Sequence, residues 1–494
     1  MNINELNDQE LNRLEKLKKY QELGLDPYGQ AFKVSNSFEE IRKLCGKKSA
    51  AKLEKLDFHV SVAGRIKAIR KMGKASFMNI QDKTGNMQVY LSLDNLGKKN
   101  YELFKMADIG DIVGIKGVMN LTRTGELTIK AKKFVHLTKC LHPLPEKFHG
   151  LTDVEERSRR RYLDLIMNDE ARKVAFMRPK IVRSIQHFLD GQGFVEVETS
   201  ILSPTLGGAA ARPFVTHHNT LDKDFYLRIA TELNLKRLIV GGMERVYEIG
   251  RLFRNEGMDA SHNPEFTSIE IYQAYTDLKG IGALTEQMIR NTAKEVTGSA
   301  IVKYGDRDID FKSPFRWISM NDLIKEKCGI DFKQVKTYEE AKALADKKGL
   351  RLDKFKNTVG YVMNEFFEEY CQADLIQPTF VYEYPIEVSP LTKKEKDPRF
   401  VQRFELFVNG KELANAYTEL NDPIDQEQRF LAQLEAKKLG DEEASEMDKD
   451  FVEALEYGMP PTGGVGMGID RFVMLLTNQS QIREIILFPT MRDR

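Results

Sequence analysis

The chain has 494 residues and a formal net charge of +1, from 75 Lys and Arg against 74 Asp and Glu. At about 150 residues per domain, this length predicts roughly three domains. Hydrophobic residues make up 41% and charged residues 30% of the chain, which excludes a collagen, a disordered tail protein and a disulfide-rich miniprotein.

Targeting and redox signals favour a cytoplasmic protein. No apolar run in the sequence approaches the roughly 18 residues that a membrane span needs, so we expect no membrane partner. Residues 1–10 are polar and acidic, and we expect no secretory signal peptide. Four cysteines lie far apart without a C-x-x-C pair, which is typical of reduced thiols rather than of zinc ligands or disulfides.

The nearly neutral total hides an uneven distribution of charge. Residues 1–150 contain 27 Lys and Arg against 17 Asp and Glu, a net charge of +10, and the remaining residues carry −9. The basic front favours binding to nucleic acid, and the acidic remainder favours a cationic substrate or metal ions. A chance excess of surface lysines is the alternative.

The first 140 residues predict a helical extension followed by a small barrel. Residues 6–23 have helical periodicity that ends at Gly24 and Pro27, so we assign 1–57 to an N-terminal helical extension. Alternating runs then indicate five short strands, at 59–69, 76–81, 87–93, 112–118 and 127–134. Five such strands are typical of an OB-fold barrel, which we place at 58–140.

This barrel has the charge of a surface that binds nucleic acid. Residues 58–140 contain 15 Lys and Arg against 6 Asp and Glu. An oligonucleotide would suit such a surface, with Phe77 available to stack on a base. From its spacing alone, however, Phe77 is more typical of a core aromatic residue.

The rest of the chain predicts an α+β domain. Two prolines in residues 141–150 indicate a linker, taken as 141–153, and we assign 154–494 to the α+β domain. Thr152-x-x-Glu155 and Thr337-x-x-Glu340 are capping boxes that predict helix starts. Between them the pattern predicts a helix that ends near residue 189 and a strand at 194–199.

A first concentration of polar residues lies at 245–275, which predicts a strand, a loop and a second strand. Arg254 and Glu256 share a face of the first strand because they are two residues apart, and Glu270 and Tyr272 share a face of the second. A hairpin would place these four polar groups on one side of the sheet. Such a face usually meets solvent, which is the alternative to a site.

A second concentration surrounds the Asn-Gly pair at 409–410, a strong signal for a two-residue hairpin turn. Glu405 and Glu412 flank the turn, and paired carboxylates can hold magnesium. Three side chains alternate onto one face of the second strand: Asn415, Tyr417 and Glu419. Glu412 has the opposite parity, so either a bulge intervenes or it serves the other side of the sheet.

The glycine-rich segment 460–476 predicts a loop that leads into a helix starting near Asp470. Arg471 falls in the first helical turn, where backbone N–H groups and an arginine suit a phosphate. The segment is neither a P-loop nor G-x-G-x-x-G, so an ordinary turn packed under a helix is the alternative.

Three longer strings relate these segments to a known family. FRNEGMDASHNPEF resembles motif 2 of the class II aminoacyl-tRNA synthetases, GVGMGIDRFVM resembles motif 3, and FVEVETSIL followed by GGAAARPF resembles motif 1 and its sequel. With GKELANAYTELNDP and the basic barrel, the match is to the lysyl-tRNA synthetases of the bacterial type and covers nearly the whole chain. The resemblance implies an α+β protein, with an OB-fold anticodon-binding domain before a class II catalytic domain built on an antiparallel sheet.

The resemblance also implies an activity. ATP activates L-lysine to lysyl-adenylate with release of pyrophosphate, and the lysyl group then passes to the 3′-terminal adenosine of tRNA(Lys). Mg²⁺ is implied to bind with the ATP substrate, and the protein is implied to be a cytoplasmic homodimer.

The nucleotide site follows from motifs 2 and 3 by matching position. Arg254 resembles the catalytic arginine that bridges the amino-acid carboxylate and the α-phosphate, and Glu256 the residue that reads the adenine amino group. His262 and Asn263 resemble residues of the ATP-binding loop, and Phe266 the aromatic that stacks on adenine. Three further positions complete the implied site: Arg471, a second catalytic arginine, on the γ-phosphate, and Glu405 and Glu412 on magnesium.

The lysine site is implied in the same way. Gly208 and Glu232 resemble the contacts to the α-amino group, and Arg254 the contact to the carboxylate. The implied pocket for the side chain and its ε-ammonium consists of Glu270, Tyr272, Asn415, Tyr417 and Glu419. Carboxylates and a phenol that converge there would replace the hydration of an ammonium.

The resemblance extends to the barrel and has exceptions. Three residues match anticodon-reading positions: Phe77, Gln88 and Glu126. The chain departs from the family pattern where Ser200 replaces the motif 1 proline, Asn234 a tyrosine, and Ser261 an arginine. Tyr417 also replaces a common phenylalanine, and Ile69-Arg70 replaces an Arg-Arg pair.

Three other functions compete with lysine activation. A sibling that activates aspartate or asparagine would need a cationic pocket, which Glu270 and Glu419 argue against. A paralogue that lysylates a protein would lack the front barrel. A nucleic-acid-binding regulator with an inactive synthetase domain would not need the matched arginines and carboxylates.

Overall fold

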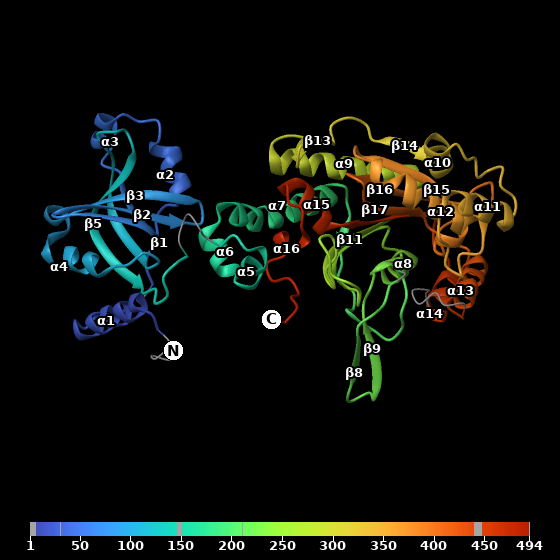
Figure 1. Ribbon diagram of the computed structural model, residues 1–494, viewed down its shortest axis with the longest axis horizontal. Helices are drawn as coiled ribbons and strands as arrows, with labels where there is room; N and C mark the ends of the chain where they lie inside the picture. The colour runs from blue at the N-terminus through green and yellow to red at the C-terminus, as the bar shows by residue number, and fades with distance from the viewer. Residues whose placement is uncertain (1–5, 30, 146–150, 210, 439–446, 494) are drawn as a thin grey trace. The chain divides into compact units, whose positions relative to one another are not determined.

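The computed structural model describes residues 6–29, 31–145, 151–209, 211–438 and 447–493. The chain divides into two compact units, Met1–Leu151 and Thr152–Arg494, whose elements are labelled in Figure 1. No helix in these described ranges is long and apolar enough to cross a membrane.

The first unit contains a closed five-stranded barrel, which confirms the predicted fold of this region. The strands are β1 (His59–Met72), β2 (Ala75–Asp82), β3 (Gly85–Ser92), β4 (Ile112–Leu121) and β5 (Leu127–Thr138), in the order β1-β2-β3-β5-β4. Val60, Val62 and Ile66 alternate along β1 and point into an apolar core, as the period of two requires.

Four helices accompany the barrel: α1 (Asp8–Glu22), α2 (Phe38–Cys45), α3 (Ala50–Leu56) and α4 (Leu93–Met106). Helix α1 confirms the predicted N-terminal helix and begins with a capping box between Asn7 and Glu10. Helices α2 to α4 had no counterpart among the predicted elements. Each buries apolar residues on one side, such as Tyr101 and Phe104 of α4 against the barrel core.

The second unit is built on an eight-stranded sheet, in the order β14-β15-β16-β17-β18-β11-β10-β6. Its strands are β6 (Val195–Glu196), β10 (Arg245–Phe253), β11 (Glu265–Ala274), β14 (Arg316–Ser319), β15 (Thr379–Pro385), β16 (Phe400–Val408), β17 (Lys411–Thr418) and β18 (Thr462–Gly468). The inner pairs are antiparallel, as expected, whereas the edge pairs β14·β15 and β10·β6 are parallel. The sheet is therefore mixed.

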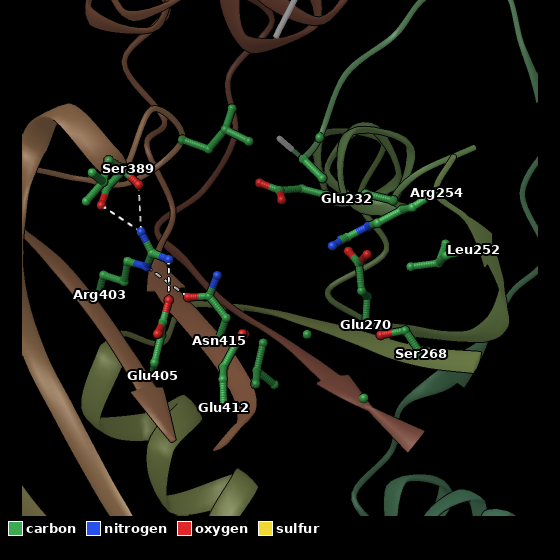
Figure 2. Close-up of a pocket in the computed structure, with 18 of the residues that line it drawn as sticks. Glu232, Leu252, Arg254, Ser268, Glu270, Ser389, Arg403, Glu405, Glu412 and Asn415 are labelled. Carbon is green, nitrogen blue, oxygen red and sulfur yellow. Dashed lines mark hydrogen bonds and ion pairs between the residues drawn. The ribbon is translucent and has the colours of Figure 1, made fainter. Parts of the chain in front are cut away.

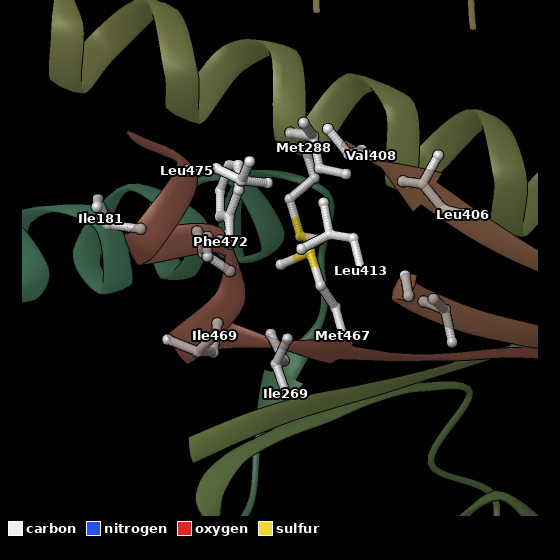
Figure 3. Packing of buried hydrophobic residues seen from close by; sticks show 14 of the residues in the cluster. Ile181, Ile269, Met288, Leu406, Val408, Leu413, Met467, Ile469, Phe472 and Leu475 are labelled. Atoms are coloured by element: carbon white, nitrogen blue, oxygen red, sulfur yellow. The ribbon is translucent and has the colours of Figure 1, made fainter. Parts of the chain in front are cut away.

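The two faces of this sheet have opposite character. One face is apolar and packs on α9 (Leu278–Thr297), α7 (Asp169–Gly191) and α15 (Ile469–Thr477). Figure 3 shows Met288 of α9 against Leu413 and Met467 of the strands below it. The residues between these apolar ones, such as Glu270 and Asn415, point to the other face. Alternation along the strands thus builds a core and a site from the same segments.

Smaller elements surround the sheet. A three-stranded sheet is formed by β7 (Leu202–Ser203), β8 (Val215–His218) and β9 (Lys223–Leu227), and a two-stranded sheet by β12 (Ile301–Tyr304) and β13 (Arg307–Asp310). The helices are α5 (Val154–Arg159), α6 (Arg161–Met167), α8 (Glu232–Val240), α10 (Met320–Cys328), α11 (Tyr338–Lys348), α12 (Val359–Tyr370), α13 (Pro423–Lys438), α14 (Lys449–Glu456) and α16 (Ile482–Ile485), with 3-10 turns at Gln372–Asp374 and Ile386–Val388.

Several local predictions need correction. The Thr337 capping box is present, but Asp153 rather than Thr152 caps α5, because its carboxylate accepts the N–H groups of Glu155 and Glu156. The strand expected at 194–199 is reduced to the two residues of β6. The glycine-rich segment is the central strand β18 rather than a turn. Of the predicted linker, 146–150 lie outside the described residues.

Candidate active site

A cavity of about 650 Å³ opens on the polar face of the large sheet. All but one of the predicted nucleotide, metal and amino-acid residues line it: Gly208, Glu232, Arg254, Glu256, His262, Asn263, Phe266, Glu270, Tyr272, Glu405, Glu412, Asn415, Tyr417 and Arg471. The exception, Glu419, lies just beyond the residues that line the cavity. Segments up to 263 residues apart in sequence therefore meet at one site. Of the four polar residues predicted for the 245–275 hairpin, Glu270 and Tyr272 are buried, whereas Arg254 is half-buried and Glu256 is exposed.

Arg254 enters the cavity directly after β10, whereas the sequence pattern placed it and Glu256 within the strand. Its backbone N–H donates to Pro264 O at 2.8 Å, which fixes the base of the motif 2 loop. The guanidinium lies 5.2 Å from the ring centre of Phe266. Its buried Nε has no hydrogen-bond partner among the described residues. A buried donor without an acceptor is suited to an anionic ligand.

The β16–β17 hairpin resolves the parity question at Glu412. Asn409 and Gly410 both have positive φ, +52° and +72°, as a type I′ turn requires. The register shifts after it, because Phe407 pairs with Glu412 whereas Leu406 pairs with Ala414. This bulge turns Glu412 onto the face of the sheet that carries the rest of the site.

Arg403 was not predicted, and it organises the middle of the cavity. Its guanidinium donates to Glu405 Oε1 at 2.5 Å, Asn415 Oδ1 at 3.0 Å and Ser389 Oγ at 3.0 Å, as Figure 2 shows. Burial lowers the pKa of Arg403, but Glu405 and other neighbours outweigh burial and raise it. Its position two residues before Glu405 in a strand was the signal that could have identified it.

Glu405 and Glu412 fit a magnesium ion that also binds phosphates. Glu405 is largely buried and also accepts a hydrogen bond from Tyr384 at 2.9 Å. Burial raises the pKa of Glu405 to about 7, Arg403 opposes this, and Glu412 adds to it by repulsion. A divalent cation would relieve that repulsion. A pair of carboxylates suits Mg²⁺, because it usually takes its other ligands from water and phosphates.

Basic side chains gather at one end of the cavity. Arg471, in the first turn of α15, donates to Glu412 O at 2.6 Å and lies 3.3 Å from His262 Nε2. Lys411 was not predicted, and its ammonium contacts Ser261 Oγ. Burial and Arg471 lower the pKa of Lys411. Lys411 thus supplies a cation beside Ser261.

Carboxylates gather at the other end. Glu270, which is 8% exposed, accepts hydrogen bonds from Tyr272 Oη at 2.9 Å and Thr231 N at 3.1 Å. Burial and Glu232 raise its pKa to about 7. Burial also raises the pKa of Glu419 to about 8, against the attraction of Lys236. In the described part of the chain, Glu419 Oε1 has no hydrogen-bond partner. An end with several buried carboxylates is suited to cations.

Two glycines leave the space that this end needs. Gly208 has φ +86°, a conformation that side chains rarely adopt, and it lies against Ala230 and Glu232. Gly464 on β18 has ordinary backbone geometry, but a Cβ there would overlap Glu419 Oε1 and the Tyr272 ring.

Replacing Gly464 with alanine is expected to raise the KM for the amino acid by about tenfold or more, because the added methyl group overpacks the carboxylate end. The measurement is amino-acid-dependent ATP–pyrophosphate exchange. Gly191→Ala is the control, since a Cβ at the end of α7 meets nothing within 4 Å. Equal KM values for both variants would contradict the assigned role of Gly464.

The barrel residues Phe77, Gln88 and Glu126 lie on neighbouring strands or their ends. Phe77 is half-buried on the side of β2 away from the core, 5.3 Å from the ring centre of Tyr90. It is therefore not the core aromatic that its spacing favoured. Gln88 Nε2 donates to Glu126 Oε2 at 2.7 Å. Together they present an aromatic ring and polar groups on one exterior face.

Comparison with known proteins agrees with this geometry. Residues 153–492 match the family described as tRNA synthetases class II (D, K and N), and residues 60–137 match the OB-fold nucleic acid binding domain. A lysine–tRNA ligase from Streptococcus suis (strain 05ZYH33) is 56% identical over 489 residues, 99% of each chain. Proteins of the same name from Bacillus cytotoxicus and Staphylococcus aureus (strain MRSA252) are 53% identical over 495 residues, with at least 99% of each chain covered. The resemblance seen in the sequence is thus confirmed, and the chain belongs to the class II tRNA synthetases of the D, K and N group.

Proposed function

We propose that this protein is a lysine–tRNA ligase, which activates L-lysine with ATP and transfers it to the 3′-terminal adenosine of tRNA(Lys). The observation that carries the proposal is the separation of positive and negative side chains between the two ends of the cavity. Basic groups at one end suit the phosphates of ATP, and buried carboxylates at the other suit the two ammonium groups of lysine.

In the proposed mechanism, the lysine carboxylate attacks the α-phosphate and pyrophosphate leaves. No protein nucleophile is needed. Arg254 holds the carboxylate against the α-phosphate, and Arg471 stabilises charge on the γ-phosphate. Glu405 and Glu412 would hold Mg²⁺, which neutralises phosphate charge when bound. Positioning and electrostatic stabilisation therefore supply the rate acceleration.

The remaining assignments are proposed from the same positions. Glu256 would accept a hydrogen bond from the adenine amino group, and Phe266 would stack on the adenine ring. His262 and Asn263 would belong to the loop that binds ATP. Gly208 and Glu232 would hold the α-ammonium. The ε-ammonium would lie among Glu270, Tyr272, Asn415, Tyr417 and Glu419.

The test is ATP–pyrophosphate exchange with magnesium and each amino acid in turn, without tRNA. Exchange with lysine alone is expected. Exchange with aspartate or asparagine would overturn the assigned substrate, and no exchange with any amino acid would favour a nucleic-acid-binding protein with an inactive synthetase domain. Charging of tRNA(Lys), and not of a protein acceptor, is expected in the second step.

The KM for lysine is expected to rise as the pH falls from about 8 to 6. The carboxyl groups of Glu270 and Glu419 have pKa values near 7 and 8 in the free protein, so they become protonated and neutral over this range. Ammonium groups of the substrate favour the ionised carboxylates and stay charged themselves. Lysine binding at pH 7 should therefore release protons, which calorimetry in two buffers measures.

The groups around these two carboxyls come from three elements: Glu232 and Lys236 on α8, Tyr272 on β11 and Tyr417 on β17. Burial raises the pKa of both tyrosines far above this range, so they stay neutral. In a Glu270→Gln variant the change near pH 7 should disappear. A KM for lysine that is constant from pH 6 to 8 would contradict the prediction.

We further propose that the barrel reads the anticodon through Phe77, Gln88 and Glu126. The proposed domains are the helical extension 1–57, the barrel 58–140, the linker 141–153 and the catalytic domain 154–494. A Phe77→Ala variant should raise the KM for tRNA(Lys) and leave ATP–pyrophosphate exchange unchanged. Equal tRNA charging by variant and parent would reject this role for Phe77.

A cytoplasmic homodimer is also proposed. Five apolar side chains are exposed on or beside the short strands β6 to β9: Val195, Ile201, Leu202, Val215 and Leu221. Leu202 and Val215 lie on opposite faces of the small sheet, so the proposal rests on the family resemblance. Sedimentation equilibrium should give twice the chain mass at micromolar concentration, and a monomer there would reject the dimer.

A further inference from the structure

A lysine of the chain itself is buried behind the carboxylate end of the cavity. Lys236 lies on α8, one turn after Glu232, and its side chain is 0% exposed. Its Nζ is 2.6 Å from Glu232 Oε1 and 2.5 Å from Glu419 Oε2. Burial lowers the pKa of this ammonium, but the two carboxylates outweigh burial and raise it, so Lys236 is a cation at neutral pH.

The bridge joins two separate elements. Glu232 is in the first turn of α8 and lines the cavity, whereas Glu419 follows β17 and lies just beyond the lining residues. The ring of Phe451 on α14 lies 5.9 Å from Nζ. Because three elements enclose the ammonium, the distance between the two carboxylates is held by packing as well as by charge.

Lys236 also decides which oxygen of Glu419 is left for a ligand. Oε2 is taken by the ion pair with Lys236. Neither oxygen of Glu419 makes a regular hydrogen bond in the described residues, and Oε1, which is outside the ion pair, lies against Gly464, which lines the cavity. The ion pair therefore directs a free, buried carboxylate oxygen toward the place proposed for the ε-ammonium.

The charges balance only with Lys236 included. The carboxylate end contains Glu232, Glu270 and Glu419, and a bound lysine brings two ammonium groups while its carboxylate meets Arg254. With Lys236 as the third cation, three positive charges face three carboxylates. Buried charges are tolerated when they are paired and are strongly unfavourable when they are not.

We propose that Lys236 is a positioning residue that sets the spacing between the carboxylate for the α-ammonium and the carboxylate for the ε-ammonium, and thereby selects an amino acid of the length of lysine. This inference rests on the proposed lysine activation. Ornithine is one methylene shorter, and a pocket alone discriminates such a difference by about 10- to 200-fold. A fixed spacing of two charged anchors penalises the shorter chain, because it cannot reach both carboxylates.

The experiment compares lysine and ornithine in ATP–pyrophosphate exchange for the full-length parent, Lys236→Met, Lys236→Gln and Lys236→Arg. The parent should prefer lysine. In the Met and Gln variants, the ratio of kcat/KM values for lysine and ornithine should fall at least tenfold, with KM for lysine changing more than kcat. Lys236→Arg keeps the cation and should recover most of the preference.

Lys139→Met is a matched control. Lys139 also has a 0% exposed side chain that bridges two carboxylates, Asp108 at 2.6 Å and Asp111 at 2.9 Å, but it lies in the barrel unit. Its loss should lower the stability of the barrel and leave the lysine-to-ornithine ratio unchanged. The parent ratio should therefore persist in this variant.

The outcomes distinguish failure of the proposed function from failure of the positioning role of Lys236. A parent protein that does not activate lysine would reject the proposed function itself. An active parent together with a folded Lys236→Met or Lys236→Gln variant that keeps the parent ratio would overturn the positioning role. The glutamine variant retains a polar group for the buried carboxylates, so its failure to fold would assign Lys236 to stability alone and would also overturn the proposal.

Discussion

Replacing Arg254 with alanine is expected to lower kcat/KM for lysine-dependent ATP–pyrophosphate exchange by about 100- to 1000-fold, the usual effect of removing one donor that stabilises transition-state charge. The side chain enters the cavity after β10, lies against Phe266 and has a buried Nε without a partner in the described chain. Its partners are therefore expected to be the substrate carboxylate and the α-phosphate.

The matched control is Arg251→Ala. Arg251 lies three residues earlier on β10 and does not line the cavity, and its side chain makes a long, exposed ion pair with Glu265 at 3.9 Å. It should retain parental kinetics, because exposed ion pairs of this kind contribute little. Unchanged turnover in Arg254→Ala would refute the assignment of the nucleotide site.

Replacing Glu270 with glutamine is expected to raise the KM for lysine by about 10- to 100-fold, because a hydrogen bond to a charged group is lost in a buried place. The amide oxygen can accept from Thr231 N, and the amide NH₂ can donate to Tyr272 Oη, which then acts as acceptor. The fold should therefore persist, and the loss should come from charge. Uncharged amino acids of similar shape should become better substrates relative to lysine. The measurement is exchange with lysine, methionine and norleucine.

Glu265→Gln serves as its control on the same strand. Glu265 begins β11, is about half-exposed and does not line the cavity. It should leave both the KM for lysine and the order of preference unchanged. A Glu270→Gln protein with parental lysine KM would remove this carboxylate from the proposed pocket.

Local physical rules explain how far prediction from the sequence succeeded. The five barrel strands and the turn at 409–410 depend on period-two alternation and on an Asn-Gly pair, both of which act over a few residues. The order of barrel and α+β domain was evident from the same alternation and from the charge imbalance, whereas length alone predicted roughly three domains and the structure has two compact units. Helices α2 to α4 were missed because short amphipathic segments give weak periodic signals.

Other features depended on contacts between distant segments. The bulge that turns Glu412 into the site depends on the pairing register between β16 and β17. The alternation of residues along the sequence left two alternatives open for the face on which Glu412 lies. The glycine-rich segment became a central strand because β11 and β17 pair with it on both sides. Small residues are required there because Tyr272 and Glu419 occupy the space above Gly464.

The sequence by itself therefore determined the barrel strands, the order of barrel and α+β domain, and the family, because these depend on local periodicity and on long matching strings. Only the tertiary structure decided that polar strand residues meet in one cavity, that Arg403 lines it with Lys411 beside it, and that Lys236 joins Glu232 to Glu419. These facts depend on burial and on distances between residues up to 263 positions apart in the chain. Neither quantity is encoded by the spacing of residues within one element.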